Sequence, residues 1–392
     1  MLTTILVLFF LAPLSPDNAP AAPTDVEKGR IAYAHQDYAE ALTRFDAAEQ
    51  TARANSDTAA VLVCLRLRAA VLRDSGDSTH ADQVLQQAAD EAAKTYGETS
   101  PELAGALEEI AVSQRAQGRS DPALAAAEKA IKIREAQTGA ARAGLARDLT
   151  LAAELHQQAN QVDQAVDLLK RAVQEWNMAL PGDPGCLPAL EALAGIYRDR
   201  SQYADAEPLL ERAIRLREVA SGPETAELIQ SVDSLAYVKF GLEKYSEAEP
   251  LYKRLLELWQ KNAGEDHPMV ALTYDKMAEF YAFQHRYEEA EKAATAALDM
   301  RARTYIASLN QTGRVLLMEA KLDDAADLYR RTEQIGDLAK APDDVMDPAL
   351  RIYARILREM KRDTEAAAIE KRVKEALLRK ADKEGRRPSP VR

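Results

Sequence analysis

Apolar and small residues recur along this chain at three- and four-residue steps, and short polar breaks interrupt them. In residues 268–283 this spacing places several side chains on one helical face: Val270, Tyr274, Met277, Ala278 and Tyr281. After a polar break at residues 284–286, a second stretch carries an inward stripe of Ala290, Ala294, Ala297 and Leu298. The short break predicts two antiparallel helices that pack side by side.

The helix pair is one copy of an internal repeat. Tyr245-Ser-Glu-Ala-Glu returns 42 residues later as Tyr287-Glu-Glu-Ala-Glu. An alanine marks the second helix of every copy: Ala41, Ala81, Ala123, Ala165, Ala206, Ala248, Ala290, Ala325 and Ala366. A small residue precedes each marker by 12 positions: Gly29, Ala69, Ala111, Ala153, Ala194, Ala236, Ala278, Gly313 and Ala354. The nine copies therefore predict about nine helical hairpins, and these should stack because a single hairpin cannot cover its own apolar face.

The markers are 40–42 residues apart, except for one step of 35 residues between Ala290 and Ala325. This shorter step predicts a trimmed loop between the seventh and eighth repeats, with a local change of curvature.

The pattern resembles the tetratricopeptide repeat, which has a small residue in its first helix, an alanine 12 positions on, and core residues four and seven positions after that. The 42-residue period, the loop Gly264-Glu-Asp-His-Pro268 and the Tyr-x-Glu-Ala-Glu phrase are similar to the kinesin-light-chain subtype common in bacterial proteins. The resemblance implies an all-α, right-handed solenoid whose concave side accepts a peptide or protein segment.

The two ends of the chain differ from the repeats, which we expect to span residues 25–378. Residues 1–21 contain the apolar run Ile5–Leu11 and a small-x-small pattern, which are typical of a secretory signal peptide. The run is too short to span a bilayer. Residues 379–392 mix charges with Gly and Pro, and predict a basic, disordered tail. We expect export to the periplasm or cell envelope. Because no Lys or Arg precedes the apolar run, an uncleaved anchor or a mis-set start, with a cytoplasmic location, stays open.

The charge of the chain bears on its partners. The formal net charge is −12, although residues 351–392 hold 14 Lys and Arg against 7 Asp and Glu. An acidic body repels phosphate, so nucleic acid is not an expected partner.

Residues with catalytic or metal-binding chemistry are sparse. Cys64 and Cys186 lie three repeats apart, too far for a disulfide in a stacked array; Cys64 is expected in the core and Cys186 in a loop or at a helix start. The five histidines lack metal-ligand spacing, and His267 belongs to the repeat loop with an expected structural role. Neither a phosphate-binding loop nor a nucleophile elbow occurs in the sequence. We therefore expect no enzyme activity, no cofactor and no metal.

The resemblance implies that first-helix residues on the concave side bind the partner. The asparagines with which that subtype reads a peptide backbone are mostly replaced here by carboxylates. The predicted binding residues are Glu108, Glu154, Glu191, Asp233, Asp275 and Glu279, with Tyr237, Phe240 and Tyr274 as aromatic anchors, and Asn310. The resulting hypothesis is a non-catalytic scaffold that binds a segment bearing Lys or Arg. Three alternatives remain open: ordinary solvated carboxylates, a groove occupied by the basic C-terminal region, and a cytoplasmic sensory or regulatory module.

Overall fold

The computed structural model describes residues 24–137, 141–338 and 341–383, and every regular element within these ranges is a helix. The first nine α-helices are α1 (Asp25–Ala34), α2 (Tyr38–Ala54), α3 (Thr58–Asp74), α4 (Ser78–Tyr96), α5 (Pro101–Ala116), α6 (Ser120–Glu135), α7 (Ala141–Gln158), α8 (Val162–Ala179) and α9 (Leu187–Asp199). The others are α10 (Tyr203–Ser221), α11 (Ile229–Gly241), α12 (Tyr245–Ala263), α13 (Pro268–Phe283), α14 (Tyr287–Met318), α15 (Leu322–Leu338), α16 (Asp343–Glu359) and α17 (Asp363–Lys383). Two 3₁₀ turns, η1 (Pro184–Cys186) and η2 (Ala226–Leu228), precede α9 and α11. The predicted all-α repeat solenoid is confirmed.

The turn inside each hairpin confirms the phase of all nine repeats. All nine marker alanines are buried, and the residue five positions before each one has a positive φ. These nine residues are Gln36, Gly76, Gly118, Asn160, Ser201, Glu243, His285, Ala320 and Lys361. Most of them are not glycine, although a left-handed conformation is unfavourable for residues with a Cβ atom. Packing of the two helices therefore imposes this tight turn.

Side-chain caps define several helix starts. Thr24 forms a capping box with Glu27 at the start of α1. Asp37, Asp57 and Asp77 each accept a hydrogen bond from the backbone N–H three residues later, at 3.0–3.2 Å. These contacts satisfy amide donors that the first turn of a helix leaves unpaired.

The small residue of the first helix makes room for a large side chain of the second. A Cβ atom built on Gly29 would lie 2.6 Å from the ring of Phe45, and one on Gly313 would lie 2.6 Å from the ring of Tyr329. The close approach of the two helices therefore depends on the small residues 12 positions before the marker alanines.

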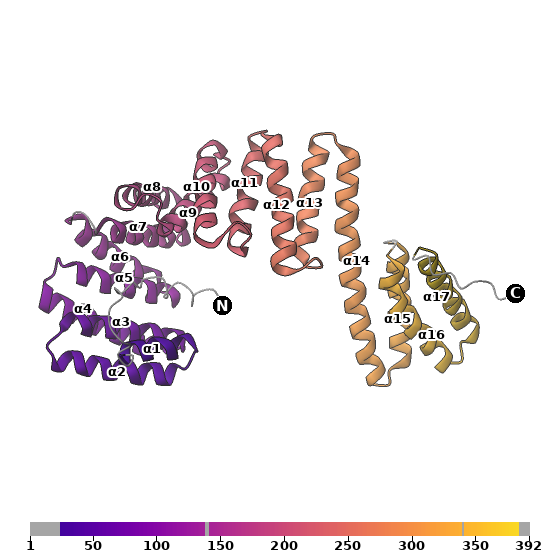
Figure 1. Ribbon diagram of the computed structural model, residues 1–392, viewed down its shortest axis with the longest axis horizontal. Coiled ribbons are helices and arrows are strands. Elements are labelled where there is room, and N and C mark those ends of the chain that lie inside the picture. The colour runs from indigo at the N-terminus through magenta and orange to yellow at the C-terminus, as the bar shows by residue number, and fades with distance from the viewer. Residues whose placement is uncertain (1–23, 138–140, 339–340, 384–392) are drawn as a thin grey trace, which may run out of the picture. The chain divides into compact units, whose positions relative to one another are not determined.

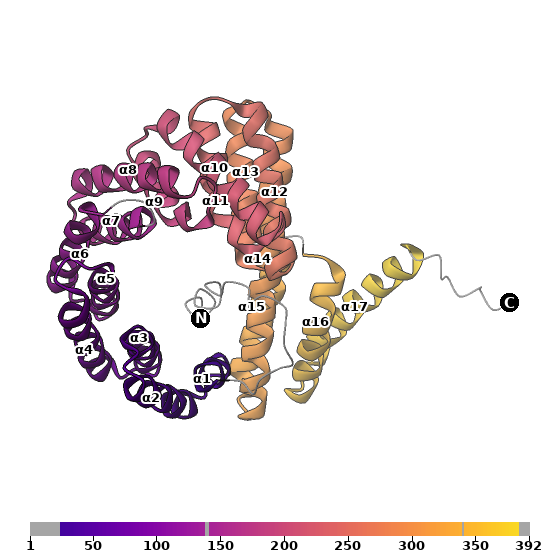
Figure 2. The same cartoon turned by 60° about the vertical axis from the view of Figure 1, so that its left-hand side comes forward.

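The chain divides into two compact units, residues 1–216 and 217–392, so that α10 contributes to both. In the first unit, α3, α5 and α7 follow one another along the inner side of a curved, two-layer array, and α2, α4, α6 and α8 form its outer layer (Figure 2). The second unit contains the C-terminal part of α10 and all later helices.

The connection between the seventh and eighth repeats differs from the prediction. The loop there is absent, and α14 continues for 32 residues as the second helix of repeat 7 and the first helix of repeat 8 (Figure 1). Ala290 and Ala297 are buried as predicted, but Ala294 is exposed and Leu298 is 53% exposed. The inward stripe was therefore wrong at two positions, because the following repeat does not fold back over them.

The predicted signal peptide, residues 1–21, lies outside the described residues. At the other end, α17 runs to Lys383, five residues into the segment predicted to be a disordered tail, and residues 384–392 are not described. In the described part of the chain, no helix combines the length and apolar character that a membrane span requires.

Candidate partner-binding surface

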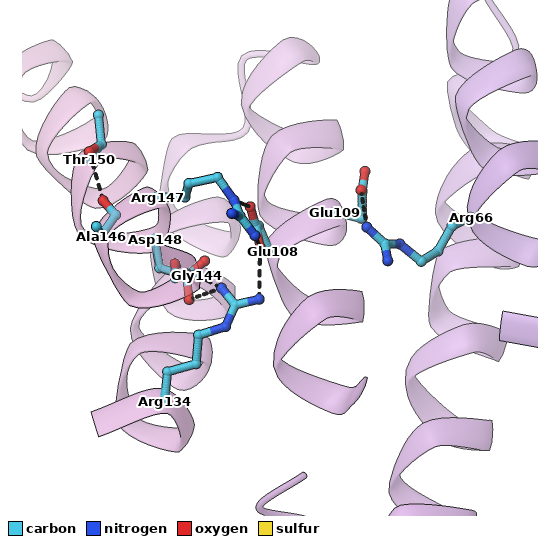
Figure 3. A network of polar contacts seen from close by, with 9 residues as sticks. All are labelled: Arg66, Glu108, Glu109, Arg134, Gly144, Ala146, Arg147, Asp148 and Thr150. Carbon is cyan, nitrogen blue, oxygen red and sulfur yellow. Dashed lines mark hydrogen bonds and ion pairs between the residues drawn. The ribbon is translucent and has the colours of Figure 1, made fainter. Parts of the chain in front are cut away.

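Glu108, the first of the predicted acidic residues, lies in a network of charges between α5, α6 and α7 (Figure 3). Arg134 donates from Nη2 to Glu108 Oε2 at 2.8 Å and from Nη1 to Asp148 Oδ2 at 2.5 Å. Arg147 donates from Nε to Glu108 Oε1 at 2.8 Å. The Glu108 carboxylate thus joins side chains from two following helices, which holds these repeats in register.

Burial affects the two acids of this network differently. Asp148 has no solvent exposure, and its Oδ1 atom has no hydrogen-bond partner within the described residues. Burial, with the nearby charge of Glu108, raises the pKa of Asp148 to about 7 despite the contact with Arg134. Burial also opposes ionisation of Glu108, but hydrogen bonds from Arg147 and charge from both arginines lower its pKa below the ordinary value.

Three more of the predicted carboxylates are also paired. Arg115 donates to Glu154, and Lys276 donates from Nζ to Asp233 at 2.6 Å. Arg301 donates to Asp275 through both terminal nitrogens, in one case at 3.1 Å. Arg115 and Lys276 each belong to the first helix of the repeat adjacent to that of the carboxylate, whereas Arg301 lies in α14. The predicted stripe is therefore a series of ion pairs, divided between the two units, and its negative charge is largely compensated.

The remaining predicted residues differ in exposure. Glu191 is half-buried, whereas Glu279 is exposed. Asn310 is half-buried, and its side-chain oxygen has no hydrogen-bond partner among the described residues. Its backbone carbonyl accepts a hydrogen bond from the hydroxyl of Tyr329 at 3.4 Å.

The aromatic residues proposed as anchors are not equally accessible. Phe240 is half-buried in a cluster with Phe280 and Phe283, at centroid distances of 5.9 and 5.2 Å. Tyr274 is also half-buried, while Tyr237 is 48% exposed. Tyr237 is thus the most accessible of the three proposed anchors.

Sequence reasoning missed the arginines and lysines that accompany the carboxylates. Arg66 lies 43 residues from its partner Glu109, and Lys276 lies 43 residues from Asp233. Opposite charges separated by about one repeat length would have been a usable signal, because equivalent positions of adjacent first helices lie side by side.

Cys64, Cys186 and His267 contribute to the packing and capping of the helices. Cys64 is in the core of α3 as predicted, and Cys186 ends η1, where it is also buried. Burial raises the pKa of both thiols. His267 caps α13 by accepting a hydrogen bond from the backbone N–H of Met269 at 3.3 Å, and it stacks on Trp259 at a centroid distance of 5.3 Å. These contacts agree with the structural role expected for His267.

Comparison with known proteins identifies the repeat. One tetratricopeptide repeat model matches residues 65–136, 145–219 and 225–303, and a second matches residues 277–345. No curated protein sequence matches the chain.

Several solved structures are similar. One is the structure of nearly identical TPR-like repeats of a kinesin light chain from Podosopora anserina, which is 22% identical to this chain in sequence. The match covers 51% of this chain and 95% of that chain, with a TM-score of 0.43. BtubC (BKLC) from P. vanneervenii is 15% identical, with 58% and 92% of the two chains covered and a TM-score of 0.47. The apo quorum sensor NprR from B. thuringiensis is 13% identical, with coverage of 90% and 86% and a TM-score of 0.48.

Proposed function

Because the matching repeat models cover more than half of its length, the chain belongs to the tetratricopeptide repeat family, and we propose that it acts as a non-catalytic scaffold. Members of this family bind proteins or peptides. The proposed binding surface is the face of the first helices that carries the ion pairs of Glu108, Glu154, Asp233 and Asp275.

One observation supports this surface: several of its charged side chains are already held in ion pairs. Glu108, Arg134 and Arg147 are held by mutual hydrogen bonds, as are Asp233 and Lys276. The carboxylates are therefore positioned before a partner binds them, so less binding free energy is lost to ordering the site.

The ion pairs of the second unit are better suited to exchange with a partner than the network around Glu108. The side chains of Asp233 and Lys276 are each 35% exposed, whereas Arg134 and Asp148 are buried. An exposed ion pair contributes at most about 1 kcal/mol, so a Lys or Arg of a partner can displace Lys276 or Arg301 at small cost. We therefore propose a partner segment with basic side chains, bound at Asp233 and Asp275 beside Tyr237 and Glu279.

The test is affinity capture with the full chain as bait, followed by binding measurements on the captured partner. Asp233→Asn together with Asp275→Asn preserves side-chain shape and leaves Lys276 and Arg301 without these carboxylates. A basic segment should bind several-fold more weakly to this variant, and the loss should shrink at high salt.

A matched control removes the same charge from second helices. Glu257 in α12 and Glu291 in α14 are exposed, so the variant Glu257→Gln with Glu291→Gln changes the net charge equally. Equal binding by both double variants would place the interface elsewhere. Tighter binding by the Asp233 and Asp275 variant would indicate an acidic partner and refute the proposed preference.

Export to the cell envelope is proposed from the sequence of residues 1–21. Fractionation of cells producing the full chain, with mass spectrometry of its N-terminus, tests this point. A full-length chain found in the cytoplasm would favour a sensory or regulatory module.

A further inference from the structure

The fused helix α14 interrupts the stacking of repeats inside the second unit. The step between marker alanines is seven residues shorter here than the common step of 42, and seven residues correspond to about two helical turns. In Figure 1, α13 lies beside one end of α14 and α15 lies beside the other. Repeat 8 consequently does not cover repeat 7, and each of the two repeats keeps one uncovered face.

The uncovered face of repeat 8 lies on the second half of α14 and contains Tyr305, Ser308, Thr312 and Val315. All four are exposed, Tyr305 by 54% and Val315 by 47%. The residues equivalent to Val315 in the other repeats with a preceding neighbour are at most 3% exposed: Val71, Ser113, Leu155, Ile196, Val238, Phe280 and Ile356. The equivalent residue of repeat 1, which has no preceding repeat, is Ile31, and it is 55% exposed. Repeat 8 thus resembles the first repeat of an array, although seven repeats precede it.

The uncovered face of repeat 7 shows the complementary change. Ala294 is exposed and Leu298 is 53% exposed. Residues equivalent to Ala294 are at most 4% exposed in six other repeats and in repeat 8: Phe45, Leu85, Ala127, Leu169, Leu210, Tyr252 and Tyr329. Apart from Ala294, the one exposed residue at this position is Glu370 of the terminal ninth repeat.

Contacts between intact repeats indicate how these two faces fit together. The ring of Tyr252 in repeat 6 lies 5.2 Å from the ring of Phe280 in repeat 7. Ala294 is the repeat 7 counterpart of Tyr252, and Val315 is the repeat 8 counterpart of Phe280. The repeat pattern therefore matches the face around Ala294 to the face around Val315.

The polar side chains of the second face do not prevent its burial. The hydroxyl of Ser308 donates to the carbonyl of Thr304 at 3.1 Å, and the hydroxyl of Thr312 donates to the carbonyl of Ser308 at 3.0 Å. Since these hydroxyl protons are satisfied within α14, covering the face does not cost unpaired donors.

The two faces cannot meet within one chain while α14 is continuous. Ala294 and Val315 are 21 residues apart on the same helix, which places them roughly 30 Å apart along its axis at about 1.5 Å per residue. A second copy of the chain has the same pair of faces. When two such helices lie antiparallel about a two-fold axis, the repeat 8 face of each copy covers the repeat 7 face of the other. Both faces of both copies are then buried, and the assembly is closed.

We propose that this chain forms a two-fold homodimer in which repeat 8 of each copy packs on repeat 7 of the other. A hollow lined by Leu298, Arg301, Ala302, Tyr305, Ile335 and Leu338 lies beside the α14 segment that links the two faces. Shortening of a connecting loop is a recognised route to such exchange of repeats between copies. The proposal does not depend on which partner the first helices bind.

Sedimentation velocity and light scattering of the full chain test the dimer. The wild type should have twice the mass of one chain, and Val315→Glu should give a monomer with unchanged helicity. The matched control is Val219→Glu, because Val219 in α10 is 88% exposed and distant in sequence from both faces. A monomeric wild type, or a dimer that Val315→Glu does not weaken, would overturn the proposal. A loss of helicity in Val315→Glu would also overturn it, because this residue is exposed in the single chain.

Mixing two different variants tests the exchange itself. Ala294→Lys and Val315→Glu should each be monomeric, but an equal mixture should form a dimer, since one interface then pairs Lys with Glu and the other is wild type. A mixture of Ala294→Lys with Val315→Lys should stay monomeric because one of its interfaces pairs like charges. Failure of the first mixture to dimerise, or dimerisation of both mixtures, would contradict the proposed pairing.

Restoring the missing loop provides a second test. Inserting seven residues with a central glycine after Arg301 should let repeat 8 fold back onto repeat 7 of its own chain. The inserted variant should be monomeric and as helical as the wild type. A dimer that persists after the insertion would show that the uncovered faces are not its interface.

Discussion

The buried acid Asp148 predicts an unusual dependence of stability on pH. In the folded chain its pKa is raised to about 7, mainly by burial, whereas an aspartate in an unfolded chain has a pKa of about 3.9. Between these two values the folded state binds more protons than the unfolded state. Stability should therefore fall as the pH rises from 4 to 7 and should then level off.

The size of the effect follows from the difference between the two pKa values. About three pKa units correspond to about 4 kcal/mol over the whole pH range, of which about 2–3 kcal/mol falls between pH 5 and pH 8 because the change begins near pH 4. Asp148→Asn removes the ionisation but keeps the shape of the side chain. Its stability relative to the wild type should therefore increase by this amount between pH 5 and pH 8. Glu108, whose pKa is lowered, contributes the opposite trend only below its ordinary pKa of about 4.3.

A local fluorescence signal can follow this region. Trp176 is buried in a core cluster that includes Ala146, two residues from Asp148. In a Trp259→Phe background it is the single tryptophan, because the chain contains two. Urea unfolding of the full chain at pH 5 and pH 8 then measures the stability near Asp148.

The control is Asp90→Asn, which alters an exposed aspartate of α4 and should change stability by less than about 0.5 kcal/mol at either pH. If the advantage of Asp148→Asn were the same at both pH values, or larger at pH 5, the reasoning from burial would be refuted.

Three further predictions concern packing. Gly313→Ala should destabilise the second unit by about 1–3 kcal/mol, since the new Cβ atom would overlap the ring of Tyr329. Gly105→Ala in α5, where a Cβ atom meets open space, should instead stabilise the chain by about 0.5–1 kcal/mol. Thermal unfolding of both variants measures the difference. Leu210→Ala should cost roughly 2–5 kcal/mol and raise hydrogen exchange in its own and adjacent repeats first, while uniform loss of protection along the chain would contradict independent repeats. Cys64 and Cys186 should react with a thiol reagent only on unfolding, because both are buried and burial raises the pKa of each thiol; fast labelling of the native chain would show that one is accessible.

The sequence by itself determined the helical class, the number of repeats and their phase. These properties arise from local chemistry: apolar spacing forms each helix, and a small residue 12 positions before an alanine allows each pair to approach closely. The left-handed residue five positions before every marker alanine shows that this phase holds through all nine repeats. The positions of Cys64 and His267 were predictable for the same reason, because each has a fixed place within a repeat.

Only the tertiary structure decided how the charges of neighbouring helices, within a repeat and between repeats, combine. The carboxylates of Glu108, Asp233 and Asp275 were recognised along the chain, but their partners lie 26–43 residues away. Which cation reaches which carboxylate depends on side-chain direction between stacked helices, and a pattern within one repeat does not contain this information.

The fused helix α14 also required the structure. A step shortened by seven residues is compatible with a trimmed loop or with a continuous helix, because seven residues make about two turns and preserve the helical face in both cases. The difference lies in whether repeat 8 packs on repeat 7 or extends away from it. The continuous helix leaves Ala294 and Val315 exposed, although their counterparts between neighbouring repeats are buried.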